Sequence, residues 1–458
     1  MAVKSAPDKG AGKKGLRLDA AQVLVIGFLT VIIFGGTLLM LPAASADGRS
    51  CGPETAYFTA VSCTCVTGLA VRDTGTSWSV FGQIVMLVMI QTGGLGFMTM
   101  AVMLSTFIKR AMSPKEKQVA AASLGFSSRA DTIGMVRRIF LSTGIIEGIG
   151  ALLLMIRFVP MFGARGIWYG VFHSISAFCN AGFDLFGPEF GPGSSVAGFV
   201  FDPYVNIVLM ALILTGGIGF AVWYEVKDLV VRRKRLSSYA RMVILMDAAL
   251  VFGGAALIFV FDMNHAFAGF TLPQKILASV FQSVTTRTAG FAAVDNTLLS
   301  DPSKALSIIL MFMGGASGST AGGVKINTIA VLLIAVRSIS TGQSHVTFGK
   351  RSIPNETVLR AMAVTMFALT LTITSSFIVS LNDRIPLMVA SYECVSAAAT
   401  VGLTLNATPS LSTLTHCLLM ALMFLGRVGG LTVVYSLTMK HSRRVNLVTY
   451  PDMSFPVG

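Results

Sequence analysis

Four short segments of the sequence share a glycine preceded by small or hydroxyl-bearing residues. They read Thr-Cys-Val-Thr-Gly-Leu at 64–69, Phe-Cys-Asn-Ala-Gly-Phe at 178–183, Thr-Arg-Thr-Ala-Gly-Phe at 286–291 and Ala-Thr-Val-Gly-Leu-Thr at 399–404. Glycine allows backbone angles that aim successive carbonyl oxygens inward. A narrow ring of such oxygens can replace the hydration shell of a cation such as K+. These segments therefore predict cation coordination by the backbone.

The four glycines recur at nearly even spacing, 114, 108 and 112 residues apart, which indicates a fourfold internal repeat. We expect each glycine and the residue before it to form one quarter of a cation filter. The candidate filter residues are Thr67, Gly68, Ala181, Gly182, Ala289, Gly290, Val401 and Gly402.

A short amphipathic stretch of about a dozen residues precedes each filter segment and is too brief to span a membrane, which takes about 20 residues. Re-entrant pore helices fit this length, and their partially negative C-terminal ends would favour a cation near the bilayer centre. The four stretches lie at 54–64, 168–179, 274–286 and 386–398.

A second glycine motif follows each filter glycine by 25, 34, 24 and 24 residues, inside the next apolar run. For the glycines of the first two repeats (Gly93, Gly94, Gly96, Gly216, Gly217 and Gly219) close helix packing is the expected role. The third repeat has five glycines within 314–323, where a continuous helix would cost about 1 kcal/mol per glycine. We expect this loop to be a movable gate beneath the filter, and a static kink is the alternative.

Two basic residues join the candidate gate because charges inside membrane segments usually face a cavity or a partner. Arg427 stands in an otherwise uncharged apolar segment, and Lys325 follows the glycine loop, where snorkelling to the interface is its alternative role. The candidate gate residues are Gly314, Gly315, Ser317, Gly318, Ser319, Thr320, Gly322, Gly323, Lys325 and Arg427.

Three further polar residues lie in apolar stretches. Glu147 and Asp247 could neutralise basic residues or help to bind a coupling ion, and the sequence assigns them no partners. His173 is expected to make a structural hydrogen bond, because it has no accompanying ligand residues. Six scattered cysteines without a paired motif argue against a metal site or a disulfide framework.

The composition requires a membrane as solvent. Of 458 residues, 53% are hydrophobic and only 12% are charged. The net charge of +14 could suggest nucleic acid, but the basic residues gather in short segments between apolar runs, where they act as topology signals. Basic and acidic loops alternate, so both termini are expected in the cytoplasm and no nucleic-acid partner is expected.

The predicted fold is an all-α integral membrane protein with four pseudosymmetric membrane–pore helix–membrane repeats, giving eight spanning helices and four re-entrant pore helices around a central pore. The predicted units are an N-terminal tail at 1–19, repeats at 20–110, 133–230, 240–338 and 358–440, and a C-terminal tail at 441–458. The gating loop, 314–323, lies in the third repeat.

At these motifs the chain resembles the Trk/Ktr/HKT superfamily of K+ transporters, and within it the Ktr-type membrane subunits, over about residues 20–445. The resemblance implies K+ uptake across a bacterial plasma membrane by a homodimer in the lipid bilayer. It also implies a KtrA-like cytoplasmic ring as partner. We expect that ring to bind a regulatory nucleotide and this chain to bind none. Na+ dependence, as in a symporter, is known in the Ktr group, and no Na+ site follows from the residues.

The main alternative is a secondary transporter of another cation, in which inverted repeats are common. Here every repeat is expected to begin and end on the cytoplasmic side, so the repeats are parallel, which favours a pore. An intramembrane enzyme would need a motif such as HExxH, which the sequence lacks, so no catalytic residues are predicted.

Overall fold

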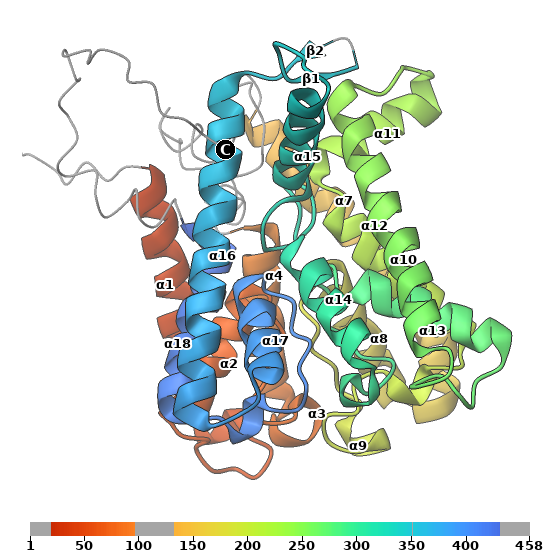
Figure 1. Cartoon of the computed structure of the whole chain (residues 1–458). Helices are drawn as coiled ribbons and strands as arrows, with labels where there is room; N and C mark the ends of the chain where they lie inside the picture. Colours follow the sequence, from red (N-terminus) through yellow and green to blue (C-terminus); the bar gives the residue numbers. More distant parts are fainter. Residues whose placement is uncertain (1–19, 97–131, 350, 431–458) are drawn as a thin grey trace, which may run out of the picture.

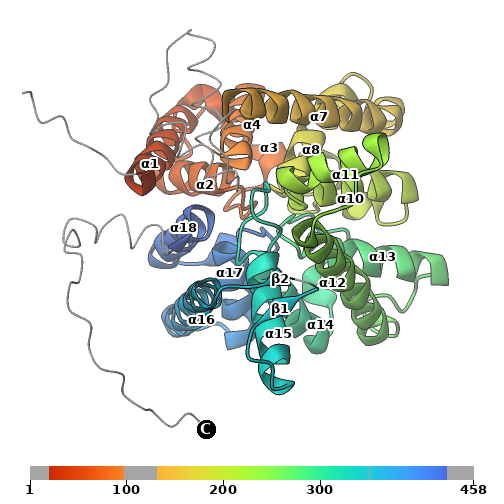
Figure 2. The same cartoon turned by 90° about the horizontal axis from the view of Figure 1, so that it is seen from above.

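The computed structural model describes residues 20–96, 132–349 and 351–430, and this part of the chain is predominantly helical. Four groups of helices stand around a common centre (Figures 1 and 2). The strands of the described residues form one small hairpin, β1 (Thr347–Phe348) with β2 (Arg351–Ser352). The predicted tails at 1–19 and 441–458, and the ends of the first and fourth repeats, lie outside the described residues.

The first helix of each group is long and continuous. These helices are α1 (Ala20–Leu39), α7 (Thr132–Phe162), α12 (Ser238–Asp262) and α16 (Asn355–Asp383), of 20, 31, 25 and 29 residues. At 1.5 Å per residue each is about 30 Å long or more, enough to cross a hydrocarbon core. Each contains a window of mean hydropathy between 1.9 and 2.4.

A short helix follows each long one, at the four stretches where the sequence predicts pore helices. They are α2 (Pro53–Cys65), α8 (Arg165–Phe178), α13 (Leu272–Thr285) and α17 (Leu387–Ala398). Their starts carry ordinary helix signals, including proline at the beginning of α2 and α13 and a capping box between Thr271 and Gln274. All four end at the filter segments, so their C-terminal ends point into the protein.

The second helix of each group stops or breaks at the second glycine motif. These helices are α4 (Val80–Leu95), α10 (Pro203–Gly217) with α11 (Phe220–Arg232), α14 (Asp301–Phe312) with α15 (Ile326–Ser340), and α18 (Thr413–Val428). Positive φ angles of +83°, +91° and +92° end the helical path at Gly96, Gly219 and Gly429. The axes of α10 and α11 differ by 107°.

The expected packing role therefore holds for only some of these glycines. A Cβ atom added to Gly93 would meet the carbonyl oxygen of Thr64, and one added to Gly216 would meet that of Phe178. Both carbonyls lie at the C-terminal ends of pore helices, so these two glycines allow close packing. Gly96 instead supplies the backbone angle that ends α4, and Gly219 supplies that of the break between α10 and α11.

Helices from neighbouring repeats pack in a cycle. The second helix of each repeat contacts the pore helix of the next: α4 with α8, α10 with α13, α14 with α17, and α18 with α2. Figure 2 shows the four groups surrounding the centre in this order. The loops within the groups contain the short helices α3 (Thr74–Ser77), α9 (Gly187–Phe190), η1 (Pro42–Ala44), η2 (Ala197–Phe199), η3 (Asn296–Leu298) and η4 (Thr408–Ser410).

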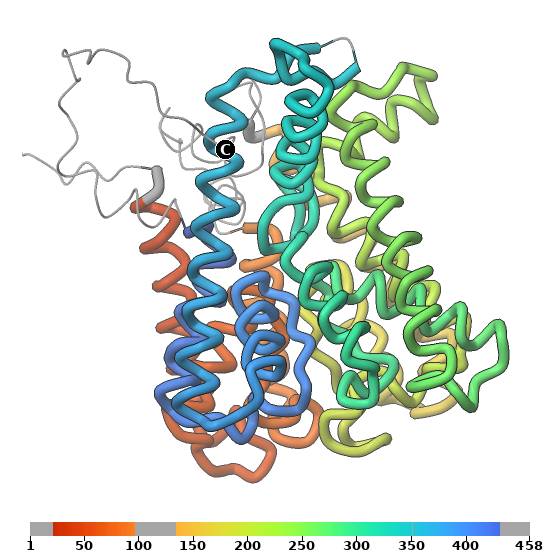
Figure 3. The backbone as a smooth tube through the Cα atoms, in the orientation of Figure 1, coloured from red at the N-terminus to blue at the C-terminus, as the bar shows by residue number. Residues whose placement is uncertain are grey.

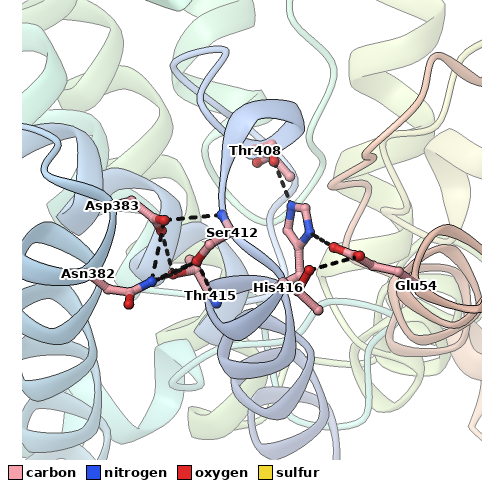
Figure 4. A network of polar contacts seen from close by, with 8 residues as sticks. Glu54, Asn382, Asp383, Thr408, Ser412, Thr415 and His416 are labelled. Carbon is pink, nitrogen blue, oxygen red and sulfur yellow. Dashed lines mark hydrogen bonds and ion pairs between the residues drawn. The ribbon is translucent and has the colours of Figure 1, made fainter.

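The fourth and first repeats are not consecutive in the chain, and a polar network joins them (Figure 4). His416 of α18 lies 2.6 Å from the Glu54 carboxylate at the start of α2, and Thr413 donates to the same carboxylate at 3.0 Å. The other ring nitrogen of His416 lies 2.8 Å from the Thr408 carbonyl oxygen. Beside it, Asp383 accepts hydrogen bonds that fix the start of α18. These contacts close the cycle of repeats.

His173 makes the structural contacts expected of it. Its Nδ1 lies 2.7 Å from the Tyr169 carbonyl oxygen, and its Nε2 accepts a hydrogen bond from the Leu185 backbone at 3.3 Å. The ring is fully buried and stacks on Phe186 with centroids 4.2 Å apart. His173 therefore fixes the loop after the second filter segment.

Candidate ion-conducting site

The four filter segments meet in a closed ring. A Cβ atom added to Gly68 would lie 2.5 Å from the Ala181 carbonyl oxygen, and one added to Gly182 would lie 2.8 Å from that of Ala289. In the same way Gly290 faces the Val401 carbonyl, and Gly402 faces the Thr67 carbonyl. Each glycine thus touches the carbonyl that precedes the glycine of the next repeat. The structure brings all eight candidate filter residues together.

Positive φ angles at the filter glycines exclude an ordinary side chain as strictly as the lack of space does. The angles are +95°, +69°, +83° and +95° for Gly68, Gly182, Gly290 and Gly402. A substitution at any of the four would both strain the backbone and collide with a neighbouring carbonyl.

Two residues before each glycine, a residue with a side chain also adopts the left-handed conformation. Val66, Asn180, Thr288 and Thr400 have φ angles of +58°, +57°, +66° and +52°. Such angles are uncommon for the β-branched Val66, Thr288 and Thr400, where the surrounding structure must impose them, and asparagine adopts them more readily. Their recurrence at the same position in four repeats indicates that the unusual backbone path belongs to the filter.

Serine hydroxyls hold two of the four glycine amides. Gly68 N–H donates to the Ser62 Oγ at 3.1 Å, and Gly402 N–H donates to the Ser396 Oγ at 3.0 Å. The third segment has Val284 at the equivalent position and no hydroxyl there. Its Ala289 and Gly290 amides instead donate to the Thr285 carbonyl oxygen at 3.0 and 3.4 Å. The third segment is therefore held differently from the first and fourth.

A vestibule of about 690 Å³ opens on the side of the ring away from the glycine loop, and all four filter glycines line it. Three carboxylates, Asp73, Asp184 and Asp295, line its wall together with one cation, Arg72. The surplus of negative charge favours cations at the mouth of the ring.

The glycine-rich loop 314–323 lies on the other side of the ring and fills the break between α10 and α11. Its Ala316 and Thr320 amides donate to the carbonyl oxygens of Gly217 and Gly216 at 2.9 and 3.2 Å. In return, Phe220 N–H donates to the Gly318 carbonyl oxygen at 2.9 Å. The backbone trace in Figure 3 shows this stretch leaving the helical path between α14 and α15. Three backbone hydrogen bonds thus join the loop to the second repeat.

The loop also contacts the filter segments, on the side of the ring opposite the vestibule. The Thr320 hydroxyl donates to the Phe178 carbonyl oxygen, at the end of α8, at 3.0 Å. A Cβ atom added to Gly322 would meet the Thr400 hydroxyl of the fourth segment. The loop therefore contacts the bases of the second and fourth filter segments.

Arg427 connects the loop to the first repeat. Its guanidinium donates to the carbonyl oxygen of Thr320 in the loop and to those of Gly93 and Gly94 at the end of α4, the last at 3.0 Å. The loop of the third repeat is therefore bonded to the second repeat directly and, through Arg427, to the fourth and first.

Lys325 also points its charge at the loop. Its Nζ donates to the carbonyl oxygens of Ala321 and Gly322 at 2.5 and 3.4 Å. Snorkelling, the alternative role for Lys325, does not describe this contact, because the ammonium is bonded within the protein. The candidate gate residues thus lie in one layer beneath the filter.

The two acids without assigned partners each contact the base of a filter segment. The Glu147 carboxylate accepts a hydrogen bond from the Gln91 amide at 3.1 Å and lies 3.8 Å from the Cys179 thiol. Asp247 forms an ion pair with Arg287, whose Nη2 lies 2.5 Å from its Oδ1. Sequence reasoning missed Arg287, although a charged residue inside a filter motif was a visible signal.

Within the described residues, no group of three His, Cys, Asp or Glu side chains could hold a metal ion, and all six cysteines are free.

Comparisons with known proteins identify a family and a fold for this chain. The family model TrkH, described as a cation transport protein, matches residues 8–446. The Ktr system potassium uptake protein B of Bacillus subtilis is 37% identical over 445 residues, covering 96% of this chain and 97% of that protein. The potassium/sodium uptake protein NtpJ of Enterococcus hirae is 35% identical over 448 residues, covering 96% and 98%.

A solved structure shows the same fold at low sequence identity. The potassium transporter TrkH from Vibrio parahaemolyticus superimposes with a TM-score of 0.70 at 17% identity, covering 94% of this chain and 87% of that one. The fourfold arrangement is therefore shared with a known transporter fold.

Proposed function

Because the chain belongs to the TrkH family of cation transport proteins, whose members are ion transporters and not enzymes, we propose that it takes up K+ through the ring of four filter segments. The observation that carries the proposal is the closed cycle in which each filter glycine faces the carbonyl oxygen of the next repeat. Relatives named for potassium uptake, at 35–37% identity over nearly their whole length, support K+ as the ion.

The eight filter residues have two roles in this proposal. The carbonyl oxygens of Thr67, Ala181, Ala289 and Val401 replace water around a dehydrated K+, and the glycines after them give those carbonyls room. The C-terminal ends of the four pore helices and the acidic vestibule add a field that favours cations over anions.

The gate in this proposal is the glycine loop with Arg427 and Lys325. The loop, rich in glycine and bonded to three repeats, lies beneath the ring and obstructs the path. Two positive charges held at the loop add an electrostatic barrier to K+. Release of the loop from Arg427 and from the break in α10 would open the path.

We also propose that the chain works as a homodimer in a bacterial plasma membrane, with both termini in the cytoplasm and a KtrA-like nucleotide-binding ring beneath it. The basic segments between the apolar runs support this orientation. We propose that K+ uptake also depends on Na+, and the name of one relative, a potassium/sodium uptake protein, supports this.

The experiment that tests the proposal is K+ uptake by cells that lack their own K+ uptake systems. The full chain is expressed with and without a cognate cytoplasmic subunit, and external Na+ is varied. We expect growth at low K+ to be restored by the parent and lost with Gly68→Ser and Gly402→Ser. Well-inserted parent protein that fails to restore growth with its partner present would contradict K+ uptake.

A further inference from the structure

The third filter segment differs from the other three in carrying a charged side chain. Arg287 stands three residues before Gly290, where the other repeats have Cys65, Cys179 and Ala399. Its side chain is only 4% exposed and lies against Asp247 of the long helix α12, whose side chain is 12% exposed. The two charged atoms are 2.5 Å apart. This ion pair is buried directly behind the filter.

An unpaired Arg287 would oppose cation binding. A guanidinium stays protonated in proteins, so its charge cannot be relieved by losing a proton. Pore helix α13 ends at Thr285, and the negative end of its dipole favours a cation at the ring. A bare positive charge two residues beyond that end would cancel this field. The Asp247 carboxylate removes the conflict because it neutralises the guanidinium at contact distance.

The same ion pair ties the third filter segment to a long helix. This segment has no serine hydroxyl on its glycine amide, and the Thr285 hydroxyl instead donates to the Phe291 carbonyl oxygen at 2.6 Å. Asp247 stands in the middle of α12, a 25-residue helix that runs from the filter layer to the gate layer. Nearer its start, Val243 of α12 packs in one cluster with Ala316 of the glycine loop and Ile326.

We propose that Asp247 is a positioning residue for the third filter segment: it neutralises Arg287 and holds it toward α12, so that the Ala289 carbonyl coordinates K+ without repulsion. The inference rests on the proposed function and adds a residue that touches neither the ion nor the gate. It also explains why a buried charge pair, which is costly to place in a membrane, is present behind this segment alone among the four.

The test compares Asp247→Asn with the double variant Asp247→Asn/Arg287→Gln in the purified full chain, reconstituted into lipid vesicles. Initial rates of K+ uptake give KM and the maximal rate, and competition by Na+ gives the discrimination ratio. Glu356→Gln/Arg360→Gln is the control, because that pair is also 2.5 Å apart but both side chains are about three-quarters exposed.

We expect Asp247→Asn to raise the KM for K+ about tenfold, because one uncompensated charge remains behind the ring. The double variant should return KM to within about threefold of the parent, since removing both charges of a buried pair is tolerated better than removing one. Its K+/Na+ discrimination should stay below that of the parent, because the segment is no longer tied to α12. The control should match the parent in both quantities.

A merely structural pair would lower the yield of folded protein and leave the KM of the folded fraction unchanged, and that result would overturn the proposal. A double variant with a KM no better than that of Asp247→Asn would overturn it too. If Asp247→Asn does not fold, the double variant alone is measured. A K+/Na+ discrimination ratio equal to that of the parent would then overturn the proposal. Failure of the proposed function itself is distinguishable, because the parent and Gly290→Ser would then show the same lack of K+ preference.

Discussion

The filter ring and the layer beneath it are built from the same four repeats, yet only the ring keeps the fourfold pattern. In the ring, each glycine faces the same carbonyl of the next repeat, and a left-handed residue recurs two positions earlier. In the layer beneath, the third repeat supplies a loop, the second supplies the break that it fills, and the fourth supplies Arg427. The ring is thus fourfold in its backbone geometry, and the layer next to it is built from unlike parts of the repeats.

The largest expected effect comes from removing the asymmetric part. Deletion of Ala316 to Ala321 should raise K+ flux at least about tenfold, a barrier change of roughly 1.4 kcal/mol. The reason is that the loop lies under the ring and is held by hydrogen bonds to the broken helix α10. Flux into vesicles, normalised to folded protein, measures it. Folded protein with unchanged flux would assign the loop a static role.

Arg427→Ala should have the same direction and a smaller size, roughly threefold in flux, because the loop keeps its bonds to α10. The substitution removes the guanidinium that joins Thr320 to Gly93 and Gly94. Arg360→Ala is the control, since Arg360 is 77% exposed and pairs with Glu356 on its own helix. A K+ flux equal to that of the parent in the Arg427→Ala variant would mean that Arg427 has only a packing role.

A third test addresses the symmetric ring. Ser62→Ala and Ser396→Ala each remove the hydroxyl that holds a filter glycine amide, a contact worth about 1 kcal/mol. We expect K+/Na+ discrimination to fall by roughly fivefold in each, and by the same amount in both. Ser279→Ala should leave it unchanged, because that hydroxyl bonds within its own helix. Unequal effects of the Ser62 and Ser396 substitutions would show that the first and fourth segments contribute unequally to K+/Na+ discrimination, although their geometry is alike.

The smallest effect should follow from opening the contact between the fourth and first repeats. Glu54→Gln removes the charge that faces His416 and should lower the Tm by about 1–2 °C, with the filter ratio unchanged. Hydrogen bonds from His416 and Thr413 hold the pKa of Glu54 below its ordinary value.

The contribution of Glu54 is therefore present above the ordinary pKa of a glutamate and is lost as the pH falls through the lowered pKa. Thermal melts should show the parent and the Glu54→Gln variant converging in acid. A Tm difference that grows as the pH falls would contradict this sign.

The repeat, the pore helices and the loop could be predicted from the sequence, because each depends on a local signal. Glycines at even spacing, apolar runs and short stretches before the filter motifs are visible without coordinates. The fold of a solved transporter confirms the all-helical membrane architecture. The placement of the filter and gate residues at one centre followed from the same signals.

The side-chain contacts between segments that are distant in the sequence could not be predicted. Arg427 donates to backbone carbonyls, which every residue has, so the sequence offers no signal for its partners. Arg287 and Asp247 are 40 positions apart, and their pairing depends on how the turn after α13 lies against α12. The end of α4 at Gly96 and the helix break at Gly219 were missed because glycine serves close packing and helix termination equally well.

The central claim, that four equivalent carbonyls encircle one K+ path, is tested most directly by serine at each filter glycine in turn. Gly68→Ser, Gly182→Ser, Gly290→Ser and Gly402→Ser are reconstituted into lipid vesicles, and the K+/Na+ uptake ratio is measured on folded protein. The closed ring predicts that all four variants lose K+ preference. A folded variant that keeps the parental ratio would place its glycine outside the ion path and contradict the ring.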